Sequence, residues 1–318
     1  MNLSRAASLI KAHNNFIILT HRRPDGDTVG SAAALCRALR KLGKTAFILQ
    51  DGECGQKLKP FLQGLTADKS FSAELTIAVD IADEKLFTLE AESFFGMVDL
   101  CIDHHPSNVF YAKNTLLDSD APAAGVVVYR LIKELGVELD KDIAEAVYLA
   151  CSTDTGCFKY SNTTAECHRI AAECMECGAD FHRINTQFFV VKTPARLAVE
   201  SEIFSRLVMS EDGKIAISVV SRDFIEKVNA DSDDMDNLSS LLMQIESAVC
   251  GILLTENTQR DTYRLSVRTR HGASACNIAL LFDGGGHERA AGGRIEGTIS
   301  DCIDRLMKAA REDIEKNV

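Results

Sequence analysis

The feature that most constrains the fold of this chain is an apolar segment that ends abruptly in ionisable side chains, at residues 98–106 (V-D-L-C-I-D-H-H-P). The apolar residues of this segment predict a buried strand. Pro106 stops the strand, because proline lacks the N–H group that a central strand donates to its neighbour. Asp103, His104 and His105 therefore stand at the end of a buried strand. Ligands of open α/β sheets bind outside the carboxyl ends of the strands, so this position is a candidate binding edge.

Other apolar segments are also followed by ionisable side chains. Strands are predicted at residues 15–20 and 75–79, and the helices between them indicate a largely parallel sheet. The first helix after a predicted strand covers residues 29–42, with Thr28 or Asp27 as its N-cap. The side chains that this arrangement gathers along one sheet edge are His21, Asp25, Asp27, Asp80, His104 and His105, and Asp154 joins them from the end of a later helix.

This collection of side chains predicts a metal centre. Four carboxylates placed close together repel one another, and most of them take up protons unless cations neutralise them. A mixture of aspartate and histidine without cysteine suits Mn²⁺, and it leaves Mg²⁺, Fe²⁺ and Co²⁺ open. The ligands are numerous enough for two ions, which is a standard arrangement for displacement at phosphorus.

The balance of charges limits the substrates that this chain can bind. Aspartate and glutamate number 46 against 35 lysines and arginines, which gives a net charge of −11. Proteins that bind long nucleic acid need a basic surface, because neutralisation of phosphates supplies most of their affinity. The composition therefore argues against long nucleic acid, and the positive charge that a small phosphorylated substrate needs has to be local.

Length and composition indicate a globular protein of two domains. The 318 residues exceed one ordinary domain, and 46% hydrophobic with 25% charged residues is typical of soluble proteins. No apolar run approaches the ~20 residues of a transmembrane helix. Residues 1–11 lack the pattern of a signal peptide. We therefore expect a cytoplasmic protein with no membrane partner.

The eleven cysteines are scattered and mostly lie in apolar segments. The densest group is Cys167, His168, Cys174 and Cys177, which raises the alternative of a structural zinc site. This group lies within a helical pattern and has no second cysteine pair, so we favour reduced, buried thiols.

The second half of the chain contains a candidate anion site. In the strand predicted at residues 262–269, alternation places Arg264, Arg268 and Arg270 on one face, and we expect Arg264 to be a solvated surface residue. Arg268 and Arg270 lead towards the glycine-rich residues 283–287, whose backbone N–H groups can approach an anion. Guanidinium groups beside exposed amides suit a terminal phosphate or a nucleotide.

The motifs as a set resemble the DHH phosphoesterase family. Residues 21–31 (H-R-R-P-D-G-D-T-V-G-S), Asp80, D-H-H-P at 103–106 and D-T-G at 154–156 are similar to its four motifs. Residues 282–292 (F-D-G-G-G-H-E-R-A-A-G) are similar to the signature of the DHHA1 domain. The resemblance covers nearly the whole chain, and its length and domain pairing most resemble the bacterial nanoRNase and pAp phosphatase group.

The resemblance implies an α/β fold of two domains with the active site in the cleft between them. A parallel-sheet DHH domain is expected at residues 1–190, a helical linker at 191–210 and a smaller α/β DHHA1 domain at 211–318. The resemblance also implies a role for each residue. One ion would be held by His21, Asp25 and Asp80, and the other by Asp27, His104 and Asp154, with Asp80 bridging the two. Asp103 would orient a histidine, and His105 would contact or protonate the substrate. The residues implied to bind the substrate are Arg268, Arg270, Gly284, Gly285, Gly286 and His287.

The resemblance also implies the reaction, the release of mononucleotides from RNAs of about two to five nucleotides, or removal of the 3′-phosphate of 3′-phosphoadenosine 5′-phosphate (pAp), or both. Hydrolysis of pApA or cyclic di-AMP stays open, as do a manganese-dependent inorganic pyrophosphatase and a nucleotide sensor without catalysis. The sequence also leaves a homodimer open. Asp283 departs from the family pattern, because relatives usually have glycine there, and this puts the substrate in doubt rather than the chemistry.

Overall fold

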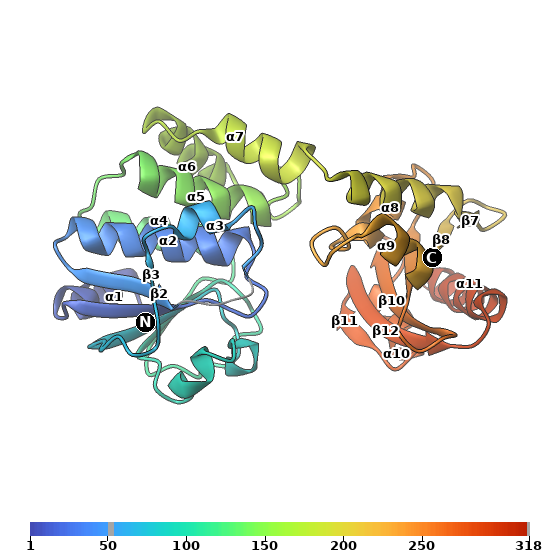
Figure 1. Cartoon of the computed structure of the whole chain (residues 1–318), viewed down its shortest axis with the longest axis horizontal. Helices are drawn as coiled ribbons and strands as arrows, with labels where there is room; N and C mark the ends of the chain where they lie inside the picture. Colours follow the sequence, from blue (N-terminus) through green and yellow to red (C-terminus); the bar gives the residue numbers. More distant parts are fainter. Residues whose placement is uncertain (50–53, 317–318) are drawn as a thin grey trace. The chain divides into compact units, whose positions relative to one another are not determined.

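The chain forms two compact units, Met1–Val191 and Lys192–Val318, in a computed structural model that describes residues 1–49 and 54–316 (Figure 1). Each unit has its own sheet and its own hydrophobic core. Among the described residues, none of the helices combines the length and the apolar character needed to span a bilayer.

The sheet of the first unit is parallel throughout, with the strand order β3-β2-β1-β4-β5-β6. This confirms the predicted α/β fold with a parallel sheet. The central strands are apolar and buried, as expected where both faces of a parallel sheet are covered. The strands are β1 (Asn15–Leu19), β2 (Thr45–Leu49), β3 (Thr66–Ala67), β4 (Leu75–Val79), β5 (Leu100–Asp103) and β6 (Thr115–Leu117).

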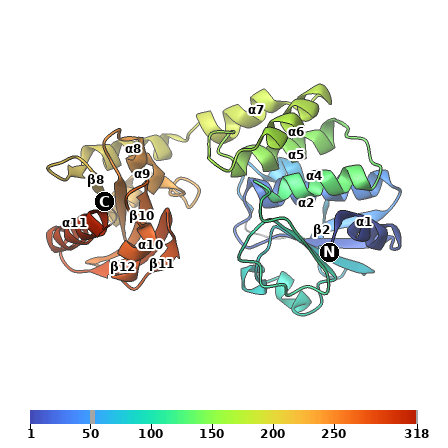
Figure 2. The ribbon, with the colours of Figure 1, turned by 180° about the vertical axis from the view of Figure 1, so that it is seen from behind.

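Helices cover one face of this sheet in successive layers. α1, α2 and α4 pack on the strands through buried residues such as Ile10, Leu35 and Val127. α5 packs on α2 and α4, and α6 packs on α5, as the view from behind shows (Figure 2). The helices of this unit are α1 (Leu3–Lys11), α2 (Gly26–Lys41), α3 (Lys59–Leu62), α4 (Ala124–Glu134), α5 (Lys141–Asp154), α6 (Ala165–Glu176), α7 (Phe181–Asn185) and the π-helix η3 (Thr186–Val190).

Short elements cover the opposite face of the sheet. The 3-10 helices η1 (Glu84–Leu86) and η2 (Ala91–Phe94) and their loops pack Phe87 and Val98 against Ile17 of β1. Both faces of the sheet are thereby closed to solvent, and the edge formed by the carboxyl ends of the strands is where polar loops lie.

The second unit has a mixed sheet with the strand order β11-β12-β10-β9-β8-β7. β8 and β9 are parallel, and the other neighbouring strands are antiparallel. One face packs against α10 and α11, and the other packs partly against α8 and the 3-10 helix η4. The strands are β7 (Val208–Met209), β8 (Ile215–Val220), β9 (Cys250–Glu256), β10 (Thr262–Thr269), β11 (Gly285–His287) and β12 (Ala290–Glu296), and the helices are α8 (Pro194–Ser205), α9 (Arg222–Val228), η4 (Leu238–Gln244), α10 (Ala275–Leu280) and α11 (Ile299–Lys316).

The segment predicted as a linker, residues 191–210, differs from the expectation. It is helical as α8, but Val199 and Ile203 are fully buried against Ala216 and Leu253 of the second unit's sheet. A helical pattern by itself does not show whether a helix has a core to pack on. The helix is therefore part of the second unit.

Helices α2, α4 and α5 approach one another closely because two glycines lie at their contacts. A Cβ atom at Gly30 of α2 would lie 2.5 Å from the carbonyl oxygen of Ala146 and 2.8 Å from the backbone nitrogen of Ala150. A Cβ atom at Gly125 of α4 would lie 2.4 Å from the Cβ atom of Ala150. The two glycines therefore determine how near the starts of α2 and α4 come to the end of α5.

We expect Gly30→Ala to destabilise the protein, although a change from glycine to alanine inside a solvated helix stabilises it by about 1 kcal/mol. The added methyl group meets backbone atoms of α5 that cannot move aside cheaply, and overpacking of this kind costs about 1–3 kcal/mol. Urea denaturation of both proteins measures the change. An unchanged or higher free energy of unfolding would show that α5 is not held at this distance.

Candidate metal centre

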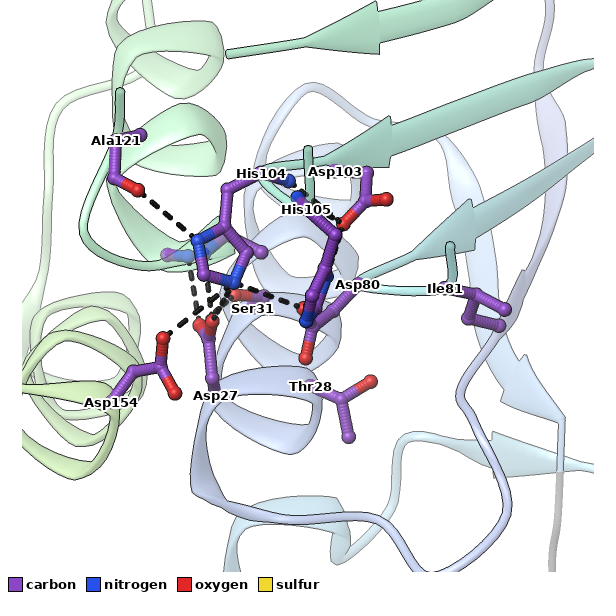
Figure 3. Close-up of polar contacts among 12 residues, drawn as sticks. Asp27, Thr28, Ser31, Asp80, Ile81, Asp103, His104, His105, Ala121 and Asp154 are labelled. Carbon is purple, nitrogen blue, oxygen red and sulfur yellow. Dashed lines mark hydrogen bonds and ion pairs between the residues drawn. The ribbon is translucent and has the colours of Figure 1, made fainter. Parts of the chain in front are cut away.

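The predicted metal ligands come together at one edge of the first unit's sheet. β1, β4 and β5 are neighbours and parallel, so their carboxyl ends lie side by side. His21 follows β1, Asp80 directly follows β4, and Asp103 is the last residue of β5. Figure 3 shows His104, which follows Asp103, pointing towards carboxylates from three other elements.

The start of α2 brings a further carboxylate to this edge. Asp25 is the N-cap, and its Oδ1 accepts hydrogen bonds from the N–H groups of Asp27 and Thr28, both at 3.0 Å. The predicted cap at Thr28 or Asp27 is therefore wrong, and the helix begins earlier. Asp27 lies in the first turn, where its carboxylate accepts the N–H groups of Ala124 at 2.7 Å and Gly125 at 2.9 Å. These are the first two residues of α4, so a helix N-terminus fixes the orientation of Asp27.

His21 and His104 are held so that the same ring nitrogen faces the carboxylates. Nδ1 of His21 bonds the carbonyl oxygen of Arg22 at 2.9 Å, and Nδ1 of His104 bonds that of Ala121 at 3.1 Å. A carbonyl oxygen only accepts, so Nδ1 is the donor in both rings, and each neutral ring has its lone pair on Nε2. This arrangement is typical of histidines that bind metal ions through Nε2.

Asp80 lies between these two histidines. Its Oδ2 is 3.7 Å from Nε2 of His21, and its Oδ1 is 3.6 Å from Nε2 of His104. These separations are too long for hydrogen bonds, and they suit pairs of ligand atoms that each bind a shared ion at about 2.1 Å. The backbone of Asp80 has a φ of 62°, a left-handed conformation that is uncommon outside glycine.

One oxygen of Asp80 lacks a hydrogen-bond donor, although ring nitrogens of His104 and His105 lie 3.6 and 3.5 Å from it. Oδ1 is buried and makes no hydrogen bond with any described residue. Burial of a carboxylate oxygen without a hydrogen bond costs free energy, so such atoms are rare in native structures and each one calls for an explanation. A cation beside Asp80 removes this cost, and the neighbouring side chains are carboxylates and imidazoles that bind divalent ions. The centre therefore fits a metal.

Within residues 1–49 and 54–316, the side chains that could share an ion form three groups, each with its ligand atoms within 4.8 Å of one another. The groups are His21, Asp25 and Asp80; Asp27, His104 and Asp154; and Asp80, His104 and His105. The structure thus brings together the members of both predicted ion-binding sets. No cysteine belongs to a group, so the described residues lend no support to zinc at Cys174 and Cys177.

The electrostatics of the centre show how much negative charge is concentrated there. Burial and the carboxylates of Asp80 and Asp154 raise the pKa of Asp27 well above its usual range. Burial raises the pKa of Asp80, and burial together with Asp80 raises the pKa of Asp154 to about 6. Burial lowers the pKa of His21, but Asp25 and Asp80 outweigh it and raise this pKa to about 10. Each shift favours a bound proton or another positive charge among these carboxylates.

Asp103 and His105 form a separate pair beside the ligands. The fully buried Asp103 accepts Nδ1–H of His105 at 2.8 Å and the backbone N–H of His104 at 2.7 Å through Oδ1. Its Oδ2 accepts Nδ2–H of Asn108 at 2.6 Å. Asp103 therefore orients His105 without facing the centre itself. The hydrogen bond with Asp103 raises the pKa of His105 to about 9, against the lowering effect of burial.

Part of the predicted anion site in the second unit lines a cavity of about 380 Å³. Arg268, Gly285 and Gly286 belong to its lining. As the alternation in β10 predicts, Leu265 and Val267 are buried on the other face of the sheet.

Other residues of the predicted anion site have different surroundings. Arg270 donates hydrogen bonds to the carbonyl oxygens of Glu246, at 2.9 Å, and Met243, so it holds the chain at the end of η4. A Cβ atom at Gly284 would lie 2.2 Å from the carbonyl oxygen of Gly292, so close packing against the neighbouring strand explains why this position is glycine. His287 is paired with Ala290 in the sheet and is exposed, but it is not among the residues that line the cavity.

The departure at Asp283 has a backbone explanation. Its φ is 49°, in the left-handed region that glycine adopts without cost and aspartate tolerates better than most residues. Aspartate can therefore replace the family's usual glycine here without changing the course of the loop.

Sequence reasoning missed the groups that orient the ligands. The carbonyl oxygens of Arg22 and Ala121 and the N–H groups at the start of α4 are backbone atoms, which no side-chain pattern reveals. The sequence gives only a weak indication of the role of Asn108. An amide side chain five residues after Asp103 can hydrogen-bond the Asp103 carboxylate across a turn. Arg264 is exposed, as expected for a solvated residue, and the expectation did not show that it also lines the cavity in the second unit.

Comparison with protein families matches both units. The model described as "DHH family, N-terminal domain" matches residues 15–151, and the one described as "DHHA1 domain" matches residues 212–316. Similar characterised sequences include two proteins named "Bifunctional oligoribonuclease and PAP phosphatase NrnA". The protein of Thermus thermophilus is 30% identical over 98% of this chain and 94% of its own length, and that of Bacillus subtilis is 26% identical over 94% of both.

Solved structures share the fold. An exopolyphosphatase-related protein from Bacteroides fragilis has a TM-score of 0.88 with 21% identity, over 98% of this chain and 96% of its own. The exonuclease RecJ, in a structure bound to manganese, has a TM-score of 0.55 with 15% identity, over 99% of this chain and 96% of its own. The resemblance inferred from the motifs is therefore confirmed at the level of sequence and of fold.

We expect Asp80→Asn to remove the response of this protein to Mn²⁺ without unfolding it. An ion that binds only the folded state, at a hundred times its Kd, stabilises a protein by about 2.7 kcal/mol. The amide has one oxygen and no charge, so the Tm shift on adding Mn²⁺ should largely disappear. In EDTA the variant should melt at or above the Tm of the unmodified protein, because a buried charge among like charges is gone.

The matched control for this variant is Asp120→Asn, which neutralises an exposed carboxylate outside the centre. It should keep the full Mn²⁺ response. A normal response in Asp80→Asn would contradict the role of Asp80 as a ligand.

Proposed function

This chain belongs to the DHH family of phosphoesterases, and we propose that it uses two divalent metal ions to hydrolyse short RNA oligonucleotides and pAp. Hydrolysis of phosphate esters is the reaction of the family. The substrates are supported by the relatives named as bifunctional oligoribonucleases and PAP phosphatases, which align with this chain over nearly its whole length.

The observation that carries this proposal is the position of Asp80. Its two oxygens face different histidines, Oδ2 towards His21 and Oδ1 towards His104, and Oδ1 makes no hydrogen bond with a described residue, although Nδ1 of His105 also lies 3.5 Å from it. In our proposal one ion is held by His21, Asp25 and Asp80, and the second by Asp27, His104 and Asp154, with Asp80 common to both. We propose Mn²⁺ because a mixed carboxylate and imidazole set suits it. Bound divalent ions polarise a phosphoryl group and lower the pKa of a water molecule.

The protein's own groups supply orientation and a proton. Asp103 accepts Nδ1–H of His105, so the other ring nitrogen, Nε2, is available to a substrate beside the centre. A protonated Nε2 can donate its proton to the oxygen that leaves phosphorus, and general acid catalysis of this kind contributes 10²–10⁴-fold. His104 and His21 keep their Nε2 lone pairs directed at the centre through their backbone hydrogen bonds. We therefore assign His105 to catalysis and Asp103 to its positioning.

The second unit supplies the local positive charge that this acidic chain needs. The cavity beside β10 is lined by Arg268 and by glycines of the residue 282–292 segment, and a volume of about 380 Å³ lies within the usual range for small-ligand sites. We propose that Arg268 binds a phosphate of the nucleotide. The net charge of −11 repels a long polyanion elsewhere on the surface, so short substrates should be preferred.

The proposal predicts a distinct product profile. With Mn²⁺, the purified full chain should release mononucleotides from RNAs of two to five nucleotides and convert pAp to AMP and phosphate, and activity should fall with increasing length. Chromatography of the products from pAp, pApA, di- to pentanucleotides and a 24-mer measures this. Degradation of the 24-mer as fast as the dinucleotide would contradict it. Activity confined to pyrophosphate or to cyclic di-AMP would assign the chain to one of the alternative reactions.

His105→Ala should lower kcat by about 10²–10⁴-fold and leave the bound metal unchanged, because we propose His105 as the acid and assign neither ion to the third group, in which it stands with Asp80 and His104. Steady-state kinetics together with metal analysis of the purified variant separate the two effects. His168→Ala, which removes an exposed imidazole on α6, is the control and should behave like the unmodified protein. Loss of one ion from His105→Ala would show that His105 is a ligand instead.

A further inference from the structure

An exposed aromatic side chain follows the segment that contains Asp103, His104 and His105. Phe110 is 64% exposed, and Val109 beside it is 55% exposed. Single exposed apolar residues are ordinary on protein surfaces, so exposure alone indicates nothing. At Phe110, however, exposure coincides with an unusual backbone and with fixed surroundings close to the metal centre.

The backbone of Phe110 is in the left-handed region, with a φ of 56°. Glycine adopts this conformation without cost, whereas a bulky side chain there is an outlier. Strained residues of this kind persist only where the surrounding structure imposes the conformation, and they cluster at functional sites. Neither the backbone conformation nor burial therefore explains why this position is phenylalanine, whereas a contact with a ligand does.

Hydrogen bonds connect Phe110 to the residues of the centre. Its N–H group donates to Oδ1 of Asn108 at 2.8 Å, and Nδ2–H of Asn108 donates to Oδ2 of Asp103 at 2.6 Å. The two bonds, with the amide group between them, place the backbone nitrogen of Phe110 within about 8 Å of the Asp103 carboxylate. Asp103 in turn orients His105, which we assign to catalysis. Phe110 thus lies close to the group proposed to act on the substrate.

The residues on both sides of Phe110 are fixed by the chain that follows β4. The N–H group of Val109 donates to the carbonyl oxygen of Ala82 at 2.9 Å, and the hydroxyl of Tyr111 donates to that of Ile81 at 3.0 Å. These two carbonyl groups belong to the residues directly after the carboxylate at the end of β4. The loop therefore presents the ring of Phe110 to solvent from a fixed position, so little conformational freedom is lost when a ligand contacts it.

A flat apolar ring in this position matches the face of a nucleobase. Aromatic side chains bind single-stranded nucleic acid by stacking on the bases, and every base has a suitable face. In the proposed function, Arg268 binds one phosphate and the metal ions bind the phosphate that is cleaved. pAp has no further group, but a dinucleotide such as pApA has a second nucleoside beyond the cleaved phosphate. None of the residues assigned above contacts this second nucleoside.

We propose that Phe110 stacks on the base of this second nucleoside. The inference rests on the proposed function, because it takes oligonucleotides as substrates, and it adds a residue that distinguishes them from pAp. Stacking depends on the area of a base rather than on its hydrogen-bonding groups, so a purine is held more tightly than a pyrimidine at this position. Phe110 therefore determines specificity, and it takes no part in proton transfer or in metal binding.

Steady-state kinetics of the full chain with Mn²⁺ on pApA, pApU and pAp test this. For the unmodified protein, KM should be lower for pApA than for pApU. Phe110→Ala should raise KM for pApA about tenfold, within the range for removal of a stacking aromatic side chain, and should reduce the difference between pApA and pApU. Phe110→Tyr, which keeps an aromatic ring, should retain the KM of the unmodified protein. pAp is the internal reference, because it lacks the second base and its KM should change least.

The matched control is Leu89→Ala. It removes an apolar side chain that is 83% exposed on the same unit and belongs neither to the centre nor to the segment around Phe110. All three KM values should stay the same in this variant.

The inference is overturned if Phe110→Ala keeps the KM of pApA, or if it raises the KM of pAp and of pApA equally. Dissociation of an oligomer by Phe110→Ala, measured by light scattering, with an unchanged KM for pApA would assign the ring to a contact between copies of this chain and would overturn it too. Absence of hydrolysis of all three substrates contradicts the proposed function itself, and the inference falls with it.

Discussion

The first unit is organised around a concentration of negative charge, partly buried, that the protein only partly compensates. Asp27 is held by two N–H groups at the start of α4, Asp25 by two at the start of α2, and Asp103 by two backbone N–H groups, His105 and Asn108. Asp80 is different, because one of its oxygens is buried without a donor among the described residues. Helix N-termini and amides orient Asp25, Asp27 and Asp103, whereas Oδ1 of Asp80 is the oxygen that a bound cation could compensate.

Close helix packing gives this centre its dimensions. Asp27 lies one turn before Gly30 on α2, and Asp154 lies one turn after Ala150 on α5. The contact of Gly30 with α5 leaves no room for a methyl group, so the two carboxylates are brought to the same His104 ring, at 3.7 Å and 3.5 Å from its Nε2. The distances between the carboxylates of the centre therefore depend on how closely the helices pack, and replacing these glycines would change both.

The charged side chains of the two units are suited to ligands of opposite charge. The first unit gathers carboxylates that attract cations, and the cavity in the second unit is lined by two arginines in a chain with a net charge of −11. A small anion can be bound at such a local positive site, whereas a long polyanion meets a surface of its own sign. The preference for short substrates that we propose rests on where the arginines lie as much as on the shape of the cavity.

The sequence alone determined the central strands of the first sheet, the strand β10 and most of the ionisable residues at the strand ends. Buried strands of a parallel sheet are mostly apolar, so the ends of these strands, where His21, Asp80 and Asp103 stand, are visible without a structure. Alternation in β10 likewise separates its buried and polar faces. These are local properties, because strand and helix periods depend only on neighbouring residues.

The tertiary structure decided what each side chain meets. The carbonyl groups that fix the rings of His21 and His104, the start of α4 at Asp27, and the packing of α8 into the second unit all join residues that sequence spacing does not bring together. Arg264 and Arg270 share a strand face, yet one lines the cavity and the other holds η4. A long side chain has several rotamers of similar energy, so its direction is set by the partners that the folded chain places around it.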